Sequence, residues 1–272
     1  MCGCQRTRRE VLAGAMTTAT ALGLAACGRA SGPETDGLSI LAPVTALASV
    51  DVAPGLRVHP RSEWGVDLPP RGLMAPETVK FLLVHHTASS NDVPDPRAVI
   101  RQTYAFHTGP QKRWPDICYH FMIGPDGSIW EARAGSLDGP VVADATGGNQ
   151  GYAQLVCLIG DFSSQAPTPA AQESLMRMLL HLADRYDVDT DPAATTTFVS
   201  RGSDKFRSGT TVTTSTISGH RDVTYTACPG DDGYAMLGDW RRRVHATRLQ
   251  RSDPGPIKRA VRLGVHLATE PG

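Results

Sequence analysis

The stretch "TVKFLLVHHTA", residues 78–88, is a compact run of apolar and β-branched residues that predicts a buried strand. It ends in the pair His85 and His86. Successive strand side chains point to opposite faces of a sheet, so only one of the two can enter a given cleft. The alternation alone does not say which. Open α/β sheets tend to place ligands at such strand ends, so the pair is a candidate for a functional site.

Helices and strands interleave on the carboxyl side of this run. The segments at 94–109 and 168–189 predict helices, the second with Thr168 as its cap and leucines at helical spacing. The segment "CYHFMIGPDGSIWEAR" predicts a hairpin of strands Cys118–Ile123 and Ser128–Arg133. Further strands are predicted at 153–162, 195–200 and 209–220. This order predicts an α/β fold, a single domain with a central mixed β-sheet flanked by helices and with the functional cleft at the sheet.

Composition narrows the class of protein. The 272 residues include 27 basic and 27 acidic side chains, so the formal net charge is zero and nothing global favours nucleic acid as a partner. A hydrophobic content of 40% is enough for a core once the chain ends are set aside.

The first 26 residues have the pattern of an export signal. Arg8 and Arg9 precede an Ala- and Thr-rich apolar stretch, which resembles a twin-arginine signal; the alternative is an ordinary secretory signal. "LAAC" resembles a lipobox that ends at Cys27, which would then carry the lipid; the alternative is a chance cysteine. Residues 27–56 then form a flexible linker, part of it apolar enough to pack on the domain. We expect an exported lipoprotein on the outer face of the cell membrane, facing the cell wall.

The segment "SGHRDVTYTACPG", residues 218–230, supplies two side chains able to bind a metal, His220 and Cys228. One histidine of the pair at 85–86 would complete a set of three. Three protein ligands and one open position are typical of a catalytic zinc site. Spacing alone is a weak signal, because each histidine could equally be a hydrogen-bonded structural residue, and Cys228 a buried thiol or half of a disulfide.

Three separated motifs, "LVHHTA", "DICYHFMIGPDGSIWEARAG" and "ISGHRDVTYTACPGD", together resemble the zinc amidase family that includes peptidoglycan recognition proteins and phage lysozyme-type amidases. The resemblance covers residues 57–247 in the family's order, and its bacterial members are the most similar. It implies that His85, His220 and Cys228 bind Zn²⁺, and that His86 faces away as a structural residue. The implied reaction is hydrolysis of the amide between N-acetylmuramic acid and L-alanine in peptidoglycan.

The resemblance also implies roles for other residues. Tyr119 would assist the developing oxyanion and Thr226 would hydrogen-bond near it, whereas His107 and Trp114 would lie near the substrate groove. The structural alternatives are a packed aromatic for Tyr119 and ordinary core residues for the last two. A second function stays open: a peptidoglycan- or muropeptide-binding module of the same fold without turnover. Either would act as a monomer.

The chain also departs from the family's pattern. Ala145 and Leu155 replace a histidine and a glycine in the expected groove wall, which puts substrate affinity in doubt. Cys118 replaces a glycine, and with Cys157 it could form a disulfide; the alternative is two buried thiols. Residues 248–272 form a basic tail, read as solvated or as attracted to anionic lipids or wall polymers.

Overall fold

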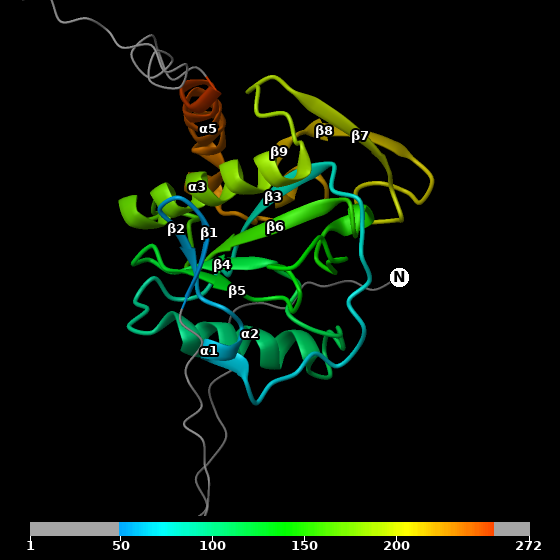
Figure 1. Ribbon diagram of the computed structural model, residues 1–272. Helices are drawn as coiled ribbons and strands as arrows, with labels where there is room; N and C mark the ends of the chain where they lie inside the picture. The colour runs from blue at the N-terminus through cyan, green and yellow to red at the C-terminus, as the bar shows by residue number, and fades with distance from the viewer. Residues whose placement is uncertain (1–48, 253–272) are drawn as a thin grey trace, which may run out of the picture. The chain divides into compact units, whose positions relative to one another are not determined.

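A computed structural model describes residues 49–252, which are built around a five-stranded sheet in the order β5-β4-β6-β3-β9 (Figure 1). β4, β6, β3 and β9 run parallel, and β5 is antiparallel to β4 at one edge. The predicted class, a single α/β domain with a mixed sheet, is therefore confirmed. The strands of this sheet are β3 (Phe81–His86), β4 (Phe121–Ile123), β5 (Ile129–Glu131), β6 (Ala153–Leu158) and β9 (Ile217–Gly219).

Two helices cover one face of this sheet, α3 (Pro169–Tyr186) and α5 (Leu237–Ser252) (Figure 1). The α3 helix begins where the sequence predicts, because the Thr168 hydroxyl accepts from the Ala171 N–H and proline occupies the first turn. Its buried leucines pack with alternate residues of β3 and β6, such as Val84 and Val156. This is the larger apolar core.

The opposite face carries α1 (Ser62–Gly65) and α2 (Pro96–Thr108). Asp95 caps α2 and Pro96 opens it, as the predicted helix requires. Ile100 and Tyr104 of α2 pack against Met122 and Cys157 of the sheet. Because side chains alternate along β3, His85 lies on this face and His86 on the α3 face.

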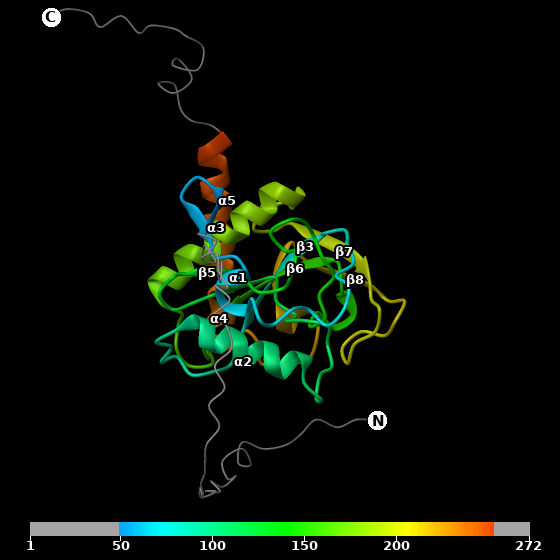
Figure 2. The same ribbon diagram turned by 60° about the horizontal axis from the view of Figure 1, so that its bottom comes forward.

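A hairpin of β7 (Thr195–Val199) and β8 (Thr211–Ser215) stands apart from the central sheet and is called here the β7–β8 arm, residues 195–215 (Figures 1 and 2). The sequence predicts strands at 195–200 and 209–220. The second one is divided in the structure: β8 pairs with β7 in the arm, and β9, after Thr216, joins the central sheet. Phe198 and Val212 anchor the arm on Phe81 and Leu155 of the sheet.

Several predicted boundaries change. The hairpin strands are shorter than predicted, because residues 118–120 lie outside β4 and residues 128, 132 and 133 lie outside β5. The β1–β2 hairpin (Val50–Ala53 and Leu56–Val58) packs on the α3 core, so the domain begins before residue 57. At the other end α5 continues to Ser252, beyond the predicted boundary at 247.

The export signal at 1–26, Cys27 and most of the basic tail lie outside the described residues. Within 49–252 no helix is both long and apolar enough to cross a membrane.

The ring of His120 is buried and bonds to two other segments of the chain, at Leu155 and Val141. Its burial predicts that the protein is less stable in acid. Its Nδ1 accepts from Leu155 N–H at 2.8 Å, so its Nε2 carries the proton donated to Val141 O at 2.8 Å. Burial lowers the pKa of His120 to about 3, whereas the pKa of a histidine in an unfolded chain is about 6.5. The stability from this neutral histidine is therefore full above about pH 6.5 and is lost as pH falls toward about 3.

We expect this one group to lower the free energy of unfolding by about 2 kcal/mol between about pH 7 and about pH 5. The measurement is urea unfolding at both pH values for the wild type and for His120→Asn. The variant is less stable at both, but its pH dependence should be flatter by about one proton. An unchanged slope would show that His120 takes up no proton on unfolding.

Candidate metal centre and cleft

The structure brings His85, His220 and Cys228 together, as the sequence predicts. Their potential ligand atoms all lie within 4.8 Å of one another. The Cys228 Sγ is 3.6 Å from His85 Nδ1, and the rings of His85 and His220 have centroids 4.2 Å apart. No other group of three such side chains with converging ligand atoms is found among residues 49–252.

Three separate elements position this cluster, which we call the His-His-Cys cluster. His85 is the second-to-last residue of β3, and His220 opens the 3₁₀ turn η2 (His220–Asp222) directly after β9. Cys228 lies in the irregular segment before α4 (Asp231–Ala235). Residues 219–228 are called here the ligand loop. Since β3 and β9 are paired parallel neighbours, their carboxyl ends deliver two histidines to one edge of the sheet.

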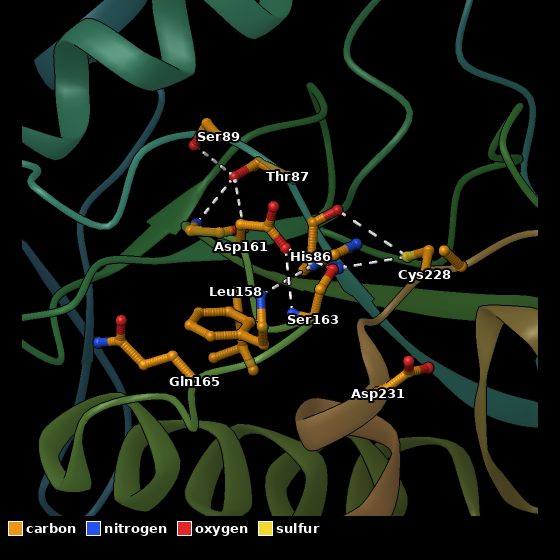
Figure 3. A network of polar contacts seen from close by, with 12 residues as sticks. His86, Thr87, Ser89, Leu158, Asp161, Ser163, Gln165, Cys228 and Asp231 are labelled. Atoms are coloured by element: carbon orange, nitrogen blue, oxygen red, sulfur yellow. Dashed lines mark hydrogen bonds and ion pairs between the residues drawn. The ribbon is translucent and has the colours of Figure 1, made fainter. Parts of the chain in front are cut away.

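His86 supports the cluster from the other face of β3 (Figure 3). Its backbone N–H donates to the Cys228 Sγ at 3.3 Å. Its ring points away, toward the segment after β6, where Nδ1 accepts from Phe162 N–H at 3.3 Å and lies 3.9 Å from an Asp161 carboxylate oxygen. The arrangement agrees with a structural role for the His86 ring.

The electrostatics of the cluster favour neutral imidazoles. Burial, with His220 next, holds the pKa of His85 well below its usual range, and burial lowers the pKa of His220 to about 4 against the opposing charge of Asp204. Burial also raises the pKa of the Cys228 thiol to about 12, against the opposing effects of the His86 N–H and the Arg221 charge. A cation at this place would reverse that last shift, since a thiol that coordinates a metal is deprotonated.

The residues present fit a zinc ion. Two neutral histidines and a cysteine are ligands that zinc prefers, and three protein ligands leave a position open for water or substrate. The buried Nε2 of His85 has no hydrogen-bond partner among the described residues, which is unusual for a buried polar atom in a protein interior. The cluster therefore has the donor atoms of a metal site.

Tyr119 and His107 lie beside the cluster, as the sequence predicts. The Tyr119 ring is half-buried, with its centroid 5.1 Å from that of His85 and 5.4 Å from that of His107. Both line a cavity of about 220 Å³ between the end of β3 and α2. Burial raises the pKa of Tyr119 well above its usual range, so its hydroxyl stays a donor at neutral pH.

The sequence does not identify the other residues of this cavity. They come from the turn after β3 and from one side of α2, and a helical pattern does not tell which side faces a ligand and which faces solvent. The further lining residues are Thr87, Ser89, Val99, Gln102, Thr103 and Phe106.

Thr226 and Trp114 occupy supporting positions. The Thr226 hydroxyl accepts from the Cys228 N–H at 3.2 Å, which fixes the backbone next to the ligand. Trp114 packs its ring on His107 at a centroid distance of 4.9 Å and is not among the residues that line the cavity. In this structure Trp114 holds His107, and His107 faces the cavity.

The structure changes two expectations that came from differences between this chain and the family's sequence pattern. Cys118 and Cys157 are buried free thiols, so the structure has the second alternative and not the disulfide. Leu155 is fully buried under the β7–β8 arm and does not form a groove wall, because its side chain fills the core with Phe81 and Val223. Ala145 packs at the edge of the same apolar cluster.

The fold and the cluster define an α/β protein with two histidines and one cysteine clustered at the carboxyl edge of its sheet. The model of the N-acetylmuramoyl-L-alanine amidase family matches residues 75–231 of the chain. The chain belongs to this family.

Two curated relatives illustrate the range of the family. The chain is 30% identical over 223 residues to an N-acetylmuramoyl-L-alanine amidase of Sus scrofa, a match that covers 78% of this chain but 32% of that relative. It is 30% identical over 194 residues to peptidoglycan recognition protein 1 of Rattus norvegicus, covering 67% of this chain and 86% of the relative. The chain thus spans about a third of one relative and most of the other.

Solved structures share the fold. Drosophila peptidoglycan recognition protein SD has a TM-score of 0.51 and 22% identity, over 68% of this chain and 95% of that one. A mutant of Drosophila PGRP-LB in complex with tracheal cytotoxin also has a TM-score of 0.51 and 22% identity, over 67% of this chain and 94% of that one.

Proposed function

We propose that the protein is a zinc-dependent N-acetylmuramoyl-L-alanine amidase that hydrolyses the amide between N-acetylmuramic acid and L-alanine in peptidoglycan. The observation that carries the proposal is the convergence of His85, His220 and Cys228, with all ligand atoms within 4.8 Å. The set is complete, and Tyr119 and His107 of the neighbouring cavity lie beside it. Membership of the amidase family supports the choice of substrate bond.

The two histidines and the cysteine would hold the ion. Bound zinc would supply a Lewis acid for the amide carbonyl and a water acidic enough to attack at neutral pH. Every other contribution comes from the protein. The His86 N–H donates to the cysteine sulfur and stabilises its negative charge. The Thr226 hydroxyl holds the Cys228 backbone in place.

Tyr119, whose ring centroid lies 5.1 Å from that of His85, would donate to the negative charge that develops in the transition state. Its hydroxyl is protonated at neutral pH, as in any tyrosine, and burial raises its pKa further, so it can donate to an oxyanion. His107, whose pKa burial lowers to about 4, is neutral and supports the Tyr119 ring from the cavity side. The cavity beside them would hold the group next to the scissile amide.

The partner we propose is peptidoglycan or a muropeptide. A structural neighbour was solved in complex with tracheal cytotoxin, which supports a ligand of this class for the shared fold. The second candidate function is a binding module without turnover, since relatives include both amidases and recognition proteins. The complete His-His-Cys cluster favours the enzyme, because recognition alone does not require a metal centre.

Labelling of newly formed amino termini after incubation with purified peptidoglycan separates the alternatives. The amidase releases new L-alanine termini; a hydrolase for another bond releases different ends. A binding module sediments with peptidoglycan and releases none. The last outcome would contradict the proposed activity.

We also propose that Cys27 carries a lipid and tethers the domain outside the cytoplasmic membrane. The support is the "LAAC" sequence at 24–27 after a basic and apolar leader. We expect radioactive palmitate to label the wild-type chain in cells and Cys27→Ala to lose the label almost completely. Two acyl chains anchor a protein where one barely does, so the variant should also leave the membrane fraction. Label that persists in Cys27→Ala would contradict the anchor.

A further inference from the structure

The tip of the β7–β8 arm lies against the ligand loop. Lys205, in the turn between β7 and β8, donates from Nζ to two successive backbone carbonyls, Arg221 O and Asp222 O, both at 2.9 Å. These are the first two residues after the ligand His220. A half-buried ammonium that serves two carbonyls of one short turn fixes the position of that turn.

Asp204, the residue before Lys205, binds the same loop closer to Cys228. Asp204 Oδ1 accepts from the Thr224 hydroxyl and from Tyr225 N–H, the latter at 3.2 Å. Together the two side chains of the tip make four hydrogen bonds to the segment between His220 and Cys228, one each at positions 221, 222, 224 and 225. Both metal ligands thus flank a segment that the arm holds.

The tip is itself an ordered platform. Ser203 Oγ accepts from the N–H groups of Lys205 and Phe206, and Ser203 N–H donates to Phe206 O at 2.8 Å. Below the tip, Val223 of the ligand loop is fully buried in the apolar cluster that contains Phe198 of the arm. The arm therefore contacts the loop through an apolar base and a polar tip.

The opposite side of the ligand loop is tied to the body of the domain. Asp222 accepts from the Tyr234 hydroxyl, while Arg221 pairs with Asp231 of α4 at 2.7 Å. Without the arm, the carbonyls of Arg221 and Asp222 and the N–H of Tyr225 would lose these partners. The segment between the two ligands would then be held less firmly.

We infer that Asp204 and Lys205 are positioning residues that hold His220 and Cys228 in register with His85 and thereby set the metal affinity of the site. The inference deepens the proposed function and rests on the His-His-Cys cluster binding zinc. Groups that orient ligands without touching a metal typically contribute about 10- to 100-fold to its affinity. Neither residue makes a hydrogen bond to the cluster atoms, so the positioning role proposed for both runs through the loop; the charge of Asp204 also acts on His220 through space.

The experiment measures zinc affinity of the full chain by competition with a chromophoric chelator, for the wild type and Lys205→Met. Methionine keeps the length of the side chain and removes the donors, and we expect binding weaker by about 10- to 100-fold. Lys80→Met is the matched control, because Lys80 Nζ donates to Thr197 O at 3.0 Å at the base of the same arm and not to the ligand loop. Its affinity should stay within about 3-fold of the wild type.

A second pair of variants keeps the test decisive if Lys205→Met does not fold. Asp204→Asn retains an acceptor for Thr224 and Tyr225 and should bind zinc nearly as the wild type does, whereas Asp204→Ala should bind more weakly. The Co²⁺-substituted proteins add a spectroscopic readout, since the thiolate-to-cobalt absorption band reports the geometry at Cys228. We expect this band to shift in Lys205→Met and Asp204→Ala only.

Wild-type affinity and an unchanged cobalt spectrum in both Lys205→Met and Asp204→Ala would overturn the positioning role while leaving the proposed activity intact. A wild-type chain that binds no zinc would overturn the metal centre, and this inference with it. The two failures are therefore distinguished by the wild-type sample alone.

Discussion

Replacing Cys228 by serine should remove the metal and the activity together. The serine hydroxyl is not deprotonated by burial or by the His86 N–H, so one of three ligands is lost. Loss of an outer partner alone costs up to about 100-fold, and loss of a ligand should exceed that. We expect the zinc content of Cys228→Ser to fall close to zero after dialysis, and the release of L-alanine termini to fall more than about 100-fold.

Cys157→Ser is the matched control for this variant. Cys157 is a buried cysteine on β6, paired in register with His85 on β3, but it is not one of the three ligands. Its substitution should lower the free energy of unfolding and leave the zinc content unchanged. Full activity in Cys228→Ser, measured on folded protein, would contradict the assignment of this cysteine.

Replacing Tyr119 by phenylalanine should slow the reaction without removing the metal. The ring still packs beside His85 and His107, but no hydroxyl remains to donate to the oxyanion. Removal of one such donor typically costs about 10²- to 10³-fold in kcat. We therefore expect kcat to fall by about 10²-fold or more, with zinc content and KM close to those of the wild type.

Tyr104→Phe controls for the loss of a buried hydroxyl elsewhere. Tyr104 lies on α2, and its hydroxyl donates to Pro69 O at 2.7 Å. Removal of this hydroxyl should lower the free energy of unfolding and leave kcat unchanged. Equal kcat for Tyr119→Phe and the wild type would mean that the hydroxyl takes no part in the reaction. A kcat loss matched by a loss of zinc would instead place Tyr119 in support of the metal.

The fold class and the long elements were readable from the sequence because their signals are local. The cap at Thr168 and the leucine spacing of α3 depend only on neighbouring residues. The start of β4 was not readable, because residues 118–120 have strand-like composition but lie outside the strand, where the His120 ring bonds to Leu155 N–H and Val141 O. The β1–β2 hairpin was missed for a related reason: its residues pack on α3, which lies more than a hundred positions away.

For the site, the sequence supplied the three candidate ligands but not the choice within the pair at 85–86. Alternation along β3 puts one histidine on each face, and only the placement of α3 decides which face holds the core. The family resemblance selected His85, and the geometry agrees with it. The cavity lining from α2 could not be assigned, because the exposed side of an amphipathic helix gives no sign of a ligand.

Leu155 and the tip of the arm show what needs tertiary structure. A leucine where relatives have glycine suggested an obstruction of the groove, yet the β7–β8 arm covers this position and turns the leucine into core. In the same way "RGSDKFRSG", residues 201–209, reads as an ordinary polar loop. Only the folded chain brings Asp204 and Lys205 of this loop to the segment between His220 and Cys228.

The most direct measurement follows zinc and turnover in the same sample. The protein is stripped with a chelator and reloaded in steps, and at each step bound zinc per chain and the rate of new L-alanine termini from peptidoglycan are recorded. We expect the rate to rise in proportion to bound zinc and to level off at about one ion per chain, as three protein ligands with one open position require. A chain that binds one zinc ion but releases no new L-alanine termini would contradict the proposed activity. A chain that binds no zinc at any step of the reloading would contradict the metal centre itself.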